Sequence, residues 1–170
     1  MTALVIIDGD NVNRTLQRLN RYIDYLKLLE IVTEVTNHDD LEAHLFITIP
    51  KGRRQMTLAI EECDELKGRG IQIHDWFDGH GGYPDQVIID FVHERQASYP
   101  CDTIMMVTAD RDFAELLREE YEAHHRVIAI SPQQVRWPDF VVRSNIPALA
   151  KAYPDLLHHS PLVHSHRAAG

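Results

Sequence analysis

Short apolar runs alternate with helical patterns along this chain, and that alternation constrains its fold more than any other feature. The runs are rich in β-branched residues, as expected of strands buried on both faces of a parallel sheet. Five runs are predicted as strands: Leu4–Ile7, Ala43–Ile49, Ile71–Ile73, Thr103–Val107 and Val127–Ile130. Four segments are predicted as helices: one capped by Asp24, then Arg53–Lys67, Pro84–Gln96 and Phe113–Ala123. The alternation indicates a three-layer α/β sandwich around a mostly parallel, five-stranded, Rossmann-like sheet.

Length and charge narrow the class of protein. The chain has 170 residues, enough for one domain with its own core. Its net charge of −9 argues against non-specific wrapping of nucleic acid but leaves room for a nucleic-acid enzyme that gathers acids around metal. No apolar run approaches the roughly 20 residues that span a bilayer, and Met1–Leu4 lacks the basic region of a signal peptide. Cys63 and Cys101 form no metal or disulfide pattern, so we expect a cytoplasmic protein without a membrane partner.

The composition changes towards the end of the sequence. Four histidines mark this last part: His158, His159, His164 and His166. We therefore predict one domain over residues 1–153 and a flexible, histidine-rich tail over residues 154–170. Histidines in such a tail could bind metal weakly, but a solvated segment is the simpler interpretation.

Acidic residues follow three of the predicted strands. Asp8 and Asp10 come directly after the first strand, Asp110 and Asp112 follow the fourth, and Asp85 opens the helix after the third. The carboxyl ends of parallel strands form the ligand-binding edge of an open α/β sheet, so we expect four acids to converge there: Asp8, Asp85, Asp110 and Asp112. Converging carboxylates repel one another unless a cation joins them, and oxygen ligands favour Mg²⁺ or Mn²⁺. Each acid alone also fits a helix N-cap, but two acidic clusters at two strand ends favour a metal site.

Basic residues are predicted to lie towards the same edge of the sheet. They are Arg14, Lys51, Arg53, Arg54 and Arg111. Beside a metal cluster they could hold the phosphates of a strand that the acids alone would repel. The alternative for the segment from Lys51 to Arg54 is a solvated basic turn.

These motifs resemble those of a known family. Val5–Asn11 followed by Ile23–Leu29 looks like the opening of NYN domains, a branch of the PIN-like nuclease superfamily. Cys101–Phe113 resembles their second hallmark, an Asp-Thr pair, a strand and an acidic Asp-x-Asp-Phe end. Asp85–Asp90 resembles the helix that brings a third acid in PIN-like domains. The resemblance spans about Leu4–Ile130.

The resemblance implies a PIN-like fold and an endoribonuclease that depends on Mg²⁺ or Mn²⁺. The metal ligands carried over are Asp8, Asp85, Asp110 and Asp112, and Asn11 would assist catalysis. In such an enzyme, bound metal lowers the pKa of the attacking water and neutralises the leaving oxygen of a phosphodiester. The expected partner is therefore RNA, single-stranded or structured, and a homodimer is compatible with the resemblance.

Two other functions stay open on the sequence alone. Asp8–Asp10 also resembles the nucleophile motif of haloacid-dehalogenase-like phosphatases, in which the first aspartate attacks phosphorus and the second is the acid/base. That chemistry needs a hydroxyl and a lysine downstream, for which Thr48 and Lys51 are poor fits. NYN domains usually have a Lys-Gly pair before the helix acid, where this chain has the segment Gly81-Gly82-Tyr83-Pro84. This departure leaves a second alternative function, that of a non-catalytic module that binds RNA or a protein.

Overall fold

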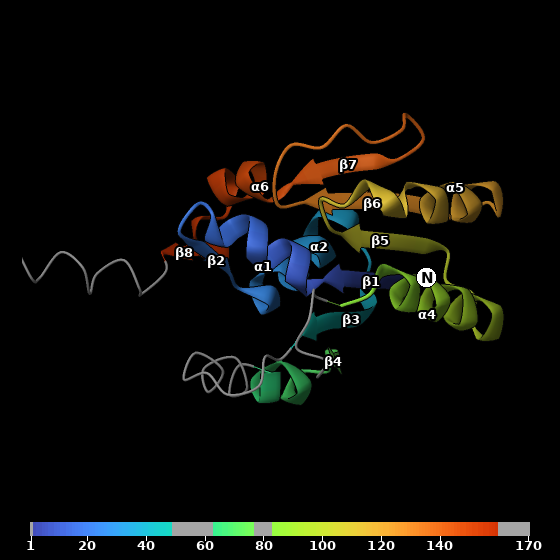
Figure 1. The fold of residues 1–170 in the computed structure, drawn as a ribbon, viewed down its shortest axis with the longest axis horizontal. Coiled ribbons are helices and arrows are strands. Elements are labelled where there is room, and N and C mark those ends of the chain that lie inside the picture. The colour runs from blue at the N-terminus through green and yellow to red at the C-terminus, as the bar shows by residue number, and fades with distance from the viewer. Residues whose placement is uncertain (1, 49–62, 77–82, 160–170) are drawn as a thin grey trace, which may run out of the picture.

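Six parallel strands form the central sheet in the computed structural model, which describes residues 2–48, 63–76 and 83–159 (Figure 1). In spatial order they are β4 (Gln72–Trp76), β3 (Asp40–Thr48), β1 (Thr2–Asp8), β5 (Thr103–Val107), β6 (Arg126–Ser131) and β7 (Val142–Asn145). Every neighbouring pair is parallel. The predicted α/β class is confirmed, and each of the predicted strands is present.

The predicted number of strands is wrong by one, because β7 was missed. Val142–Asn145 is only 4 residues long, and two of them are exposed. It lies at the edge of the sheet, where one side of the strand has no neighbour. A short, polar edge strand carries no apolar run, so the sequence pattern gave no sign of it.

Helices cover both faces of the sheet, as Figure 1 shows. On one face lie α1 (Gly9–Gln17), α2 (Tyr25–Thr36), α6 (Ile146–Ala152) and the helical residues 63–68. On the other lie α4 (Asp85–Ser98), the 3-10 turn η1 (Arg111–Phe113) and α5 (Ala114–Glu122). Leu4 and Ile6 of β1 pack towards α4 and α5, and Val5 and Ile7 pack towards the opposite layer. Burial on both faces explains why the strand is apolar at each position.

The chain reverses its direction across the sheet between β1 and β5. From β1 it moves outward through β3 to β4, and α4 then returns it to β5, on the other side of β1. Such a switch point leaves a crevice at the carboxyl ends of the two central strands, where open α/β sheets bind their ligands. Asp8 ends β1 and Asp110 follows β5, so both acidic motifs lie at the switch point.

The predicted start of the tail needs correction. The 3-10 turn η2 (Pro154–Leu156) and strand β8 (Leu157–His159) belong to the fold, and Leu156 is fully buried. β8 pairs antiparallel with β2 (Arg21–Ile23), and the His158 ring stacks on Tyr22. The prediction of a flexible tail is therefore wrong for residues 154–159. Residues 160–170, with two of the four histidines, lie outside the described residues.

Part of the predicted helix Arg53–Lys67 also lies outside the described residues, and only its end is observed, as the helical residues 63–68. The glycine-rich loop before Tyr83 is likewise not described. In the part of the chain that is described, no helix combines the length and the apolar composition needed to cross a membrane.

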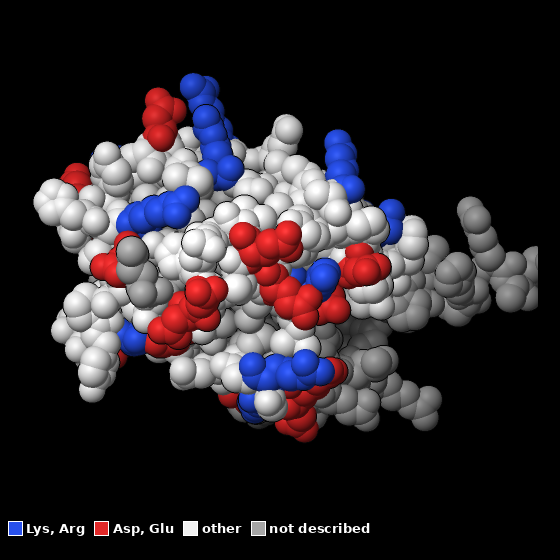
Figure 2. All heavy atoms as spheres, turned by 180° about the vertical axis from the view of Figure 1, so that it is seen from behind, with Lys and Arg blue, Asp and Glu red and all other residues white. Residues whose placement is uncertain are grey.

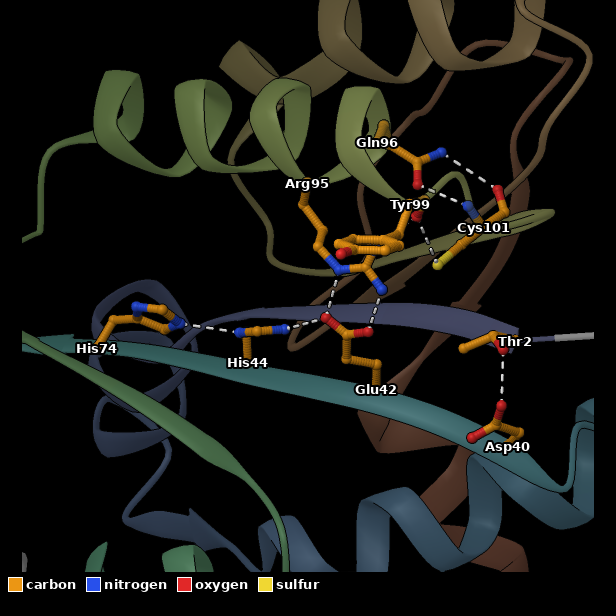
Figure 3. A network of polar contacts seen from close by, with 9 residues as sticks. All are labelled: Thr2, Asp40, Glu42, His44, His74, Arg95, Gln96, Tyr99 and Cys101. Carbon is orange, nitrogen blue, oxygen red and sulfur yellow. Dashed lines mark hydrogen bonds and ion pairs between the residues drawn. The ribbon is translucent and has the colours of Figure 1, made fainter.

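A chain of polar contacts holds α4 against the sheet (Figure 3). Arg95, near the end of α4, donates to both carboxylate oxygens of Glu42 on β3, with Nε 2.7 Å from Oε1. His44 Nε2 lies 2.8 Å from the same Oε1, and His44 Nδ1 lies 2.9 Å from His74 Nε2 on β4. Since neutral His44 donates from Nε2 to the carboxylate, its Nδ1 accepts from His74. α4, β3 and β4 are thereby joined far from the end of α4 that carries Asp85.

This network should make folding stability depend on pH. Burial is the main cause that lowers the pKa of His44 and of His74 below 6.5. The unfolded chain therefore takes up protons below about pH 6.5 that the folded protein resists, and the native state loses stability as the pH falls. Of the neighbouring charges, Arg95 opposes protonation of His44, whereas Glu42 favours protonation of His44 and Asp75 that of His74.

Asp8, whose pKa is raised to about 6, also titrates between about pH 7.5 and about pH 5.5, so the effect is measured as the difference between wild type and His74→Gln in the change of urea midpoint over this range. His74→Gln keeps a donor for His44 but removes one titrating ring, so this variant should lose less stability than wild type over the same range. His124→Gln, at an exposed position, is the matched control and should behave as wild type. Equal losses in wild type and His74→Gln would show that the pair does not contribute.

Candidate active site

Three of the predicted acids form an acidic triad at the switch point. They are Asp85, the first residue of α4, Asp110, which precedes η1, and Asp112 within η1. One carboxylate oxygen from each lies within 4.8 Å of the others. Burial raises the pKa of Asp85, and the charges of Asp110 and Asp112 raise it further. The triad therefore concentrates negative charge that a cation would relieve.

Asp8 lies next to the triad. It is buried, with 4% of the residue's surface exposed. Its Oδ1 accepts from the backbone N–H of Asn11 at 3.2 Å, and its Oδ2 accepts from the Thr108 hydroxyl at 3.0 Å. Burial raises the pKa of Asp8 to about 6, and the charges of Asp85 and Asp10 add to the shift. Asp8 is thus coupled electrostatically to Asp85, although it is not one of the three that converge most closely.

Gly9 allows α1 to begin immediately after β1. A Cβ atom at this position would lie 2.8 Å from Leu45 Cδ1 and 2.8 Å from the backbone oxygen of Phe46. The backbone oxygen belongs to β3 and has little freedom to move, so a larger residue would push α1 away from the sheet. The glycine after Asp8 therefore serves close packing, which keeps Asp8 at the end of the strand.

Side-chain hydrogen bonds connect the two acidic motifs across the switch point. Asn11 Oδ1 accepts from the backbone N–H of Ala109 at 2.8 Å. The Thr108 hydroxyl, besides donating to Asp8, accepts from the backbone N–H of Asp110 at 3.0 Å. Thr108 was missed by the sequence analysis; its only signal there is a polar residue between an apolar run and Asp110. The loop that carries the triad is thus held by residues of both motifs.

Asp10 has a different role from the aspartate two residues before it. Its carboxylate accepts from Thr48 N at 3.0 Å, from Thr48 Oγ1 at 2.6 Å and from Tyr83 N at 2.6 Å. These contacts join α1 to the end of β3 and to the segment that leads into α4. Asp10 therefore holds the segment that precedes Asp85 and is not a member of the triad.

Helix capping accounts for only part of this arrangement. Asp8 caps α1, and Asp110 caps η1 by accepting from the backbone N–H of Asp112 at 2.9 Å. The N-cap of α4 is Pro84, however, and no side chain caps that helix. Asp85 and Asp112 are therefore not explained as caps, and their proximity to Asp110 calls for another reason.

Two of the five predicted basic residues lie within the described part of the structure. The charge of Arg14 lowers the pKa of Asp85, so Arg14 lies near that carboxyl group. Arg111 is exposed within η1, between the two acids of its motif. The other three, Lys51, Arg53 and Arg54, lie outside the described residues. On the face seen from behind, Figure 2 shows acidic side chains gathered across the middle and most basic ones towards the margins. That face would repel a polyanion.

Comparison with known proteins supplies a family and a fold. The family model of the NYN domain matches residues 2–141. A solved structure of a protein of unknown function, VPA0982 from Vibrio parahaemolyticus, has a TM-score of 0.65 at 17% identity, covering 92% of this chain and 96% of that one. A structure of RSP in complex with β-NAD⁺ and operator DNA has a TM-score of 0.40 at 12% identity, covering 91% of this chain and 54% of that one. No curated protein matches the sequence.

Removing one charge from the site should stabilise the metal-free protein. Asp8→Asn and Asp110→Asn each relieve repulsion or burial of charge, and asparagine can still cap a helix. In EDTA both variants should melt at the same temperature as wild type or higher. Wild type should gain stability with Mn²⁺ or Mg²⁺, by about 2.7 kcal/mol at 100 times the dissociation constant, and the variants should gain less. Thermal scans without a metal-dependent shift in wild type, and with destabilised variants, would leave only helix caps.

Asp10→Asn provides the contrasting case within the same motif. Because Asp10 accepts three hydrogen bonds, its replacement should destabilise the fold by about 1–3 kcal/mol, with or without metal. The same thermal scans measure the effect. A variant as stable as wild type in EDTA would show that these contacts do not hold the segment before α4.

Proposed function

This chain belongs to the NYN domain family, and we propose that it is a metal-dependent endoribonuclease that hydrolyses phosphodiester bonds in RNA. NYN domains belong to the PIN-like nuclease superfamily and are generally nucleases, which supports a hydrolase. The observation that carries the proposal is the meeting of Asp85, Asp110 and Asp112 beside buried Asp8. These four acids come from separate parts of the sequence and reach one crevice through the topology of the sheet.

The donor set suits Mg²⁺ or Mn²⁺. The triad offers carboxylate oxygens only, the ligands that hard divalent cations prefer over those of zinc sites. The raised pKa of Asp85 reflects mutual repulsion in addition to burial, which is the electrostatic condition that a bound cation relieves. Bound Mg²⁺ or Mn²⁺ would supply activation of a water and neutralisation of charge on the phosphodiester.

The remaining residues of the site have supporting roles in this proposal. Asp8, Asp85, Asp110 and Asp112 hold the metal. Asn11 keeps the loop after β5 in position through Ala109 and lies beside Asp8, so it can orient that carboxylate. Arg14 and Arg111, at the border of the triad, contact substrate phosphates. Lys51, Arg53 and Arg54 are proposed to do the same.

A haloacid-dehalogenase-like phosphatase needs the second aspartate of the motif as a free acid/base. Asp10 is instead occupied by Thr48 and by the backbone of Tyr83. Its position between two structural elements suits a fixed anchor better than a group that exchanges protons with a substrate. The contacts of Asp10 therefore favour the nuclease.

Incubation of end-labelled single-stranded RNA with the protein tests the proposal directly. Cleavage should occur with Mn²⁺ or Mg²⁺ and stop in EDTA, because the acids act only through the cation. Asp8→Asn and Asp110→Asn should each slow cleavage on the order of 100-fold. Asp39→Asn, at an exposed position directly before β3, is the matched control and should cleave as wild type.

The other outcomes point elsewhere. Full activity in either purified site variant would remove that residue from the mechanism. Metal-independent RNA binding without cleavage would favour a non-catalytic module. An aspartyl-phosphate trapped on Asp8 would favour the phosphatase.

A further inference from the structure

An open cavity of about 380 Å³ lies along β7, the edge strand that the sequence analysis missed. Its lining residues are Gln134, Val135, Arg136, Arg143, Ser144 and Asn145. All except Val135 carry a polar side chain, and none is acidic. The protein has a net charge of −9, yet the described residues that line this cavity include two arginines and no acid, so their charge favours an anion.

The two arginines are available for a ligand. Arg136 and Arg143 are exposed, and neither side chain forms a salt bridge or hydrogen bond with any residue that the structure describes. Arg95, by contrast, is committed to Glu42. A guanidinium group presents its donors in a planar fork that matches the oxygens of a phosphate.

The polar neighbours add donors to the cavity. Asn145 Oδ1 accepts from the backbone N–H of Ala148 at 2.8 Å, so the side-chain amide of Asn145 keeps its N–H groups for a ligand. Ser144 and Gln134 contribute a hydroxyl and a second amide. None of the described lining residues is aromatic, so these residues offer no surface on which a base could stack. The chemistry of the lining therefore fits a phosphate and not a nucleobase.

The cavity and the acidic triad lie on the same side of the sheet. Val135 packs against the hydrophobic cluster that includes Phe113, the residue after Asp112. Arg143 pairs in register with Ala129, whose side chain belongs to the same cluster. β5 and β7 are separated only by β6, so roughly 10 Å of sheet lies between the strand before the triad and the strand of the cavity.

We propose that Arg136 and Arg143 bind backbone phosphates of the nucleic-acid strand that the acidic triad cuts. The inference rests on the proposed function, and it extends the substrate site across β6 to the edge of the sheet. Contacts to phosphates position a strand without reading its sequence, so the site should bind all sequences about equally.

Binding of a fluorescent single-stranded RNA in EDTA, followed by anisotropy over a series of salt concentrations, tests this site without cleavage. Arg136→Ala/Arg143→Ala should bind roughly tenfold more weakly or worse, and the slope of log K against log salt should fall by roughly 1.4, the value for two lost phosphate contacts on a single strand. Arg136→Lys/Arg143→Lys keeps both charges and should recover most of the slope. Circular dichroism confirms that the variants are folded.

The control removes the same charge elsewhere. Arg69→Ala/Arg126→Ala changes two exposed arginines at the amino ends of β4 and β6, away from the carboxyl edge, and should bind as wild type. If RNA binding weakens equally in both double variants, the loss of net charge alone explains the effect and the proposed phosphate site is wrong. A loss confined to one base sequence would overturn the phosphate assignment, whereas equal losses for RNA and single-stranded DNA would support it.

The same measurements separate this inference from the proposed nuclease. Cleavage of RNA together with unchanged binding in Arg136→Ala/Arg143→Ala overturns the cavity and leaves the nuclease intact. If the wild-type protein never cleaves RNA but the double variant still binds RNA more weakly, the result supports the cavity and contradicts the nuclease.

Discussion

The buried carboxylate of Asp8 is the constraint on which the rest of the site depends. Its two oxygens are held by Asn11 and Thr108, one from each side of the switch point. A carboxylate this far from solvent is costly unless such partners are present, and the pKa of about 6 shows that they offset only part of the cost. The two bonds fix β1 to the loop after β5. The position of Asp110, and through it Asp112, follows from that connection.

The Asp-Gly-Asp-Asn motif divides its tasks among neighbouring residues. Asp8 is buried at the end of β1 and bonded to Thr108, Gly9 permits close packing on β3, Asp10 anchors the segment before α4, and Asn11 holds the loop after β5. The two aspartates differ in their fixed partners. Asp10 accepts three hydrogen bonds, whereas Asp8 accepts two, is more deeply buried, and has a pKa that burial and the charge of Asp85 raise. The first arrangement stabilises a fold, and the second creates a demand for a cation.

Sequence patterns were sufficient where a feature depends on local periodicity. The strand Leu4–Ile7 is buried on both faces, so its apolar run could be read directly. The pairing of β2 with β8 could not, because each is 3 residues long and its partner lies far away in the sequence. The convergence of the acids followed from the fold class, but the anchoring role of Asp10 depends on contacts with Thr48 and Tyr83 that no spacing rule encodes.

Separating cations from acids by two strands has a physical advantage for an acidic protein. An arginine that formed an ion pair with the triad would compete with metal for its carboxylates, as Arg95 is taken up by Glu42 elsewhere in the molecule. Arg14 and Arg111 border the triad, but neither forms such an ion pair among the described residues. In the cavity beside β7, none of the lining residues that the structure describes is an acid that would compete for Arg136 and Arg143. A parallel sheet supplies this separation directly, since each strand adds about 5 Å along the edge. Attraction for a polyanion and affinity for a cation can then coexist on one side of the sheet without neutralising each other.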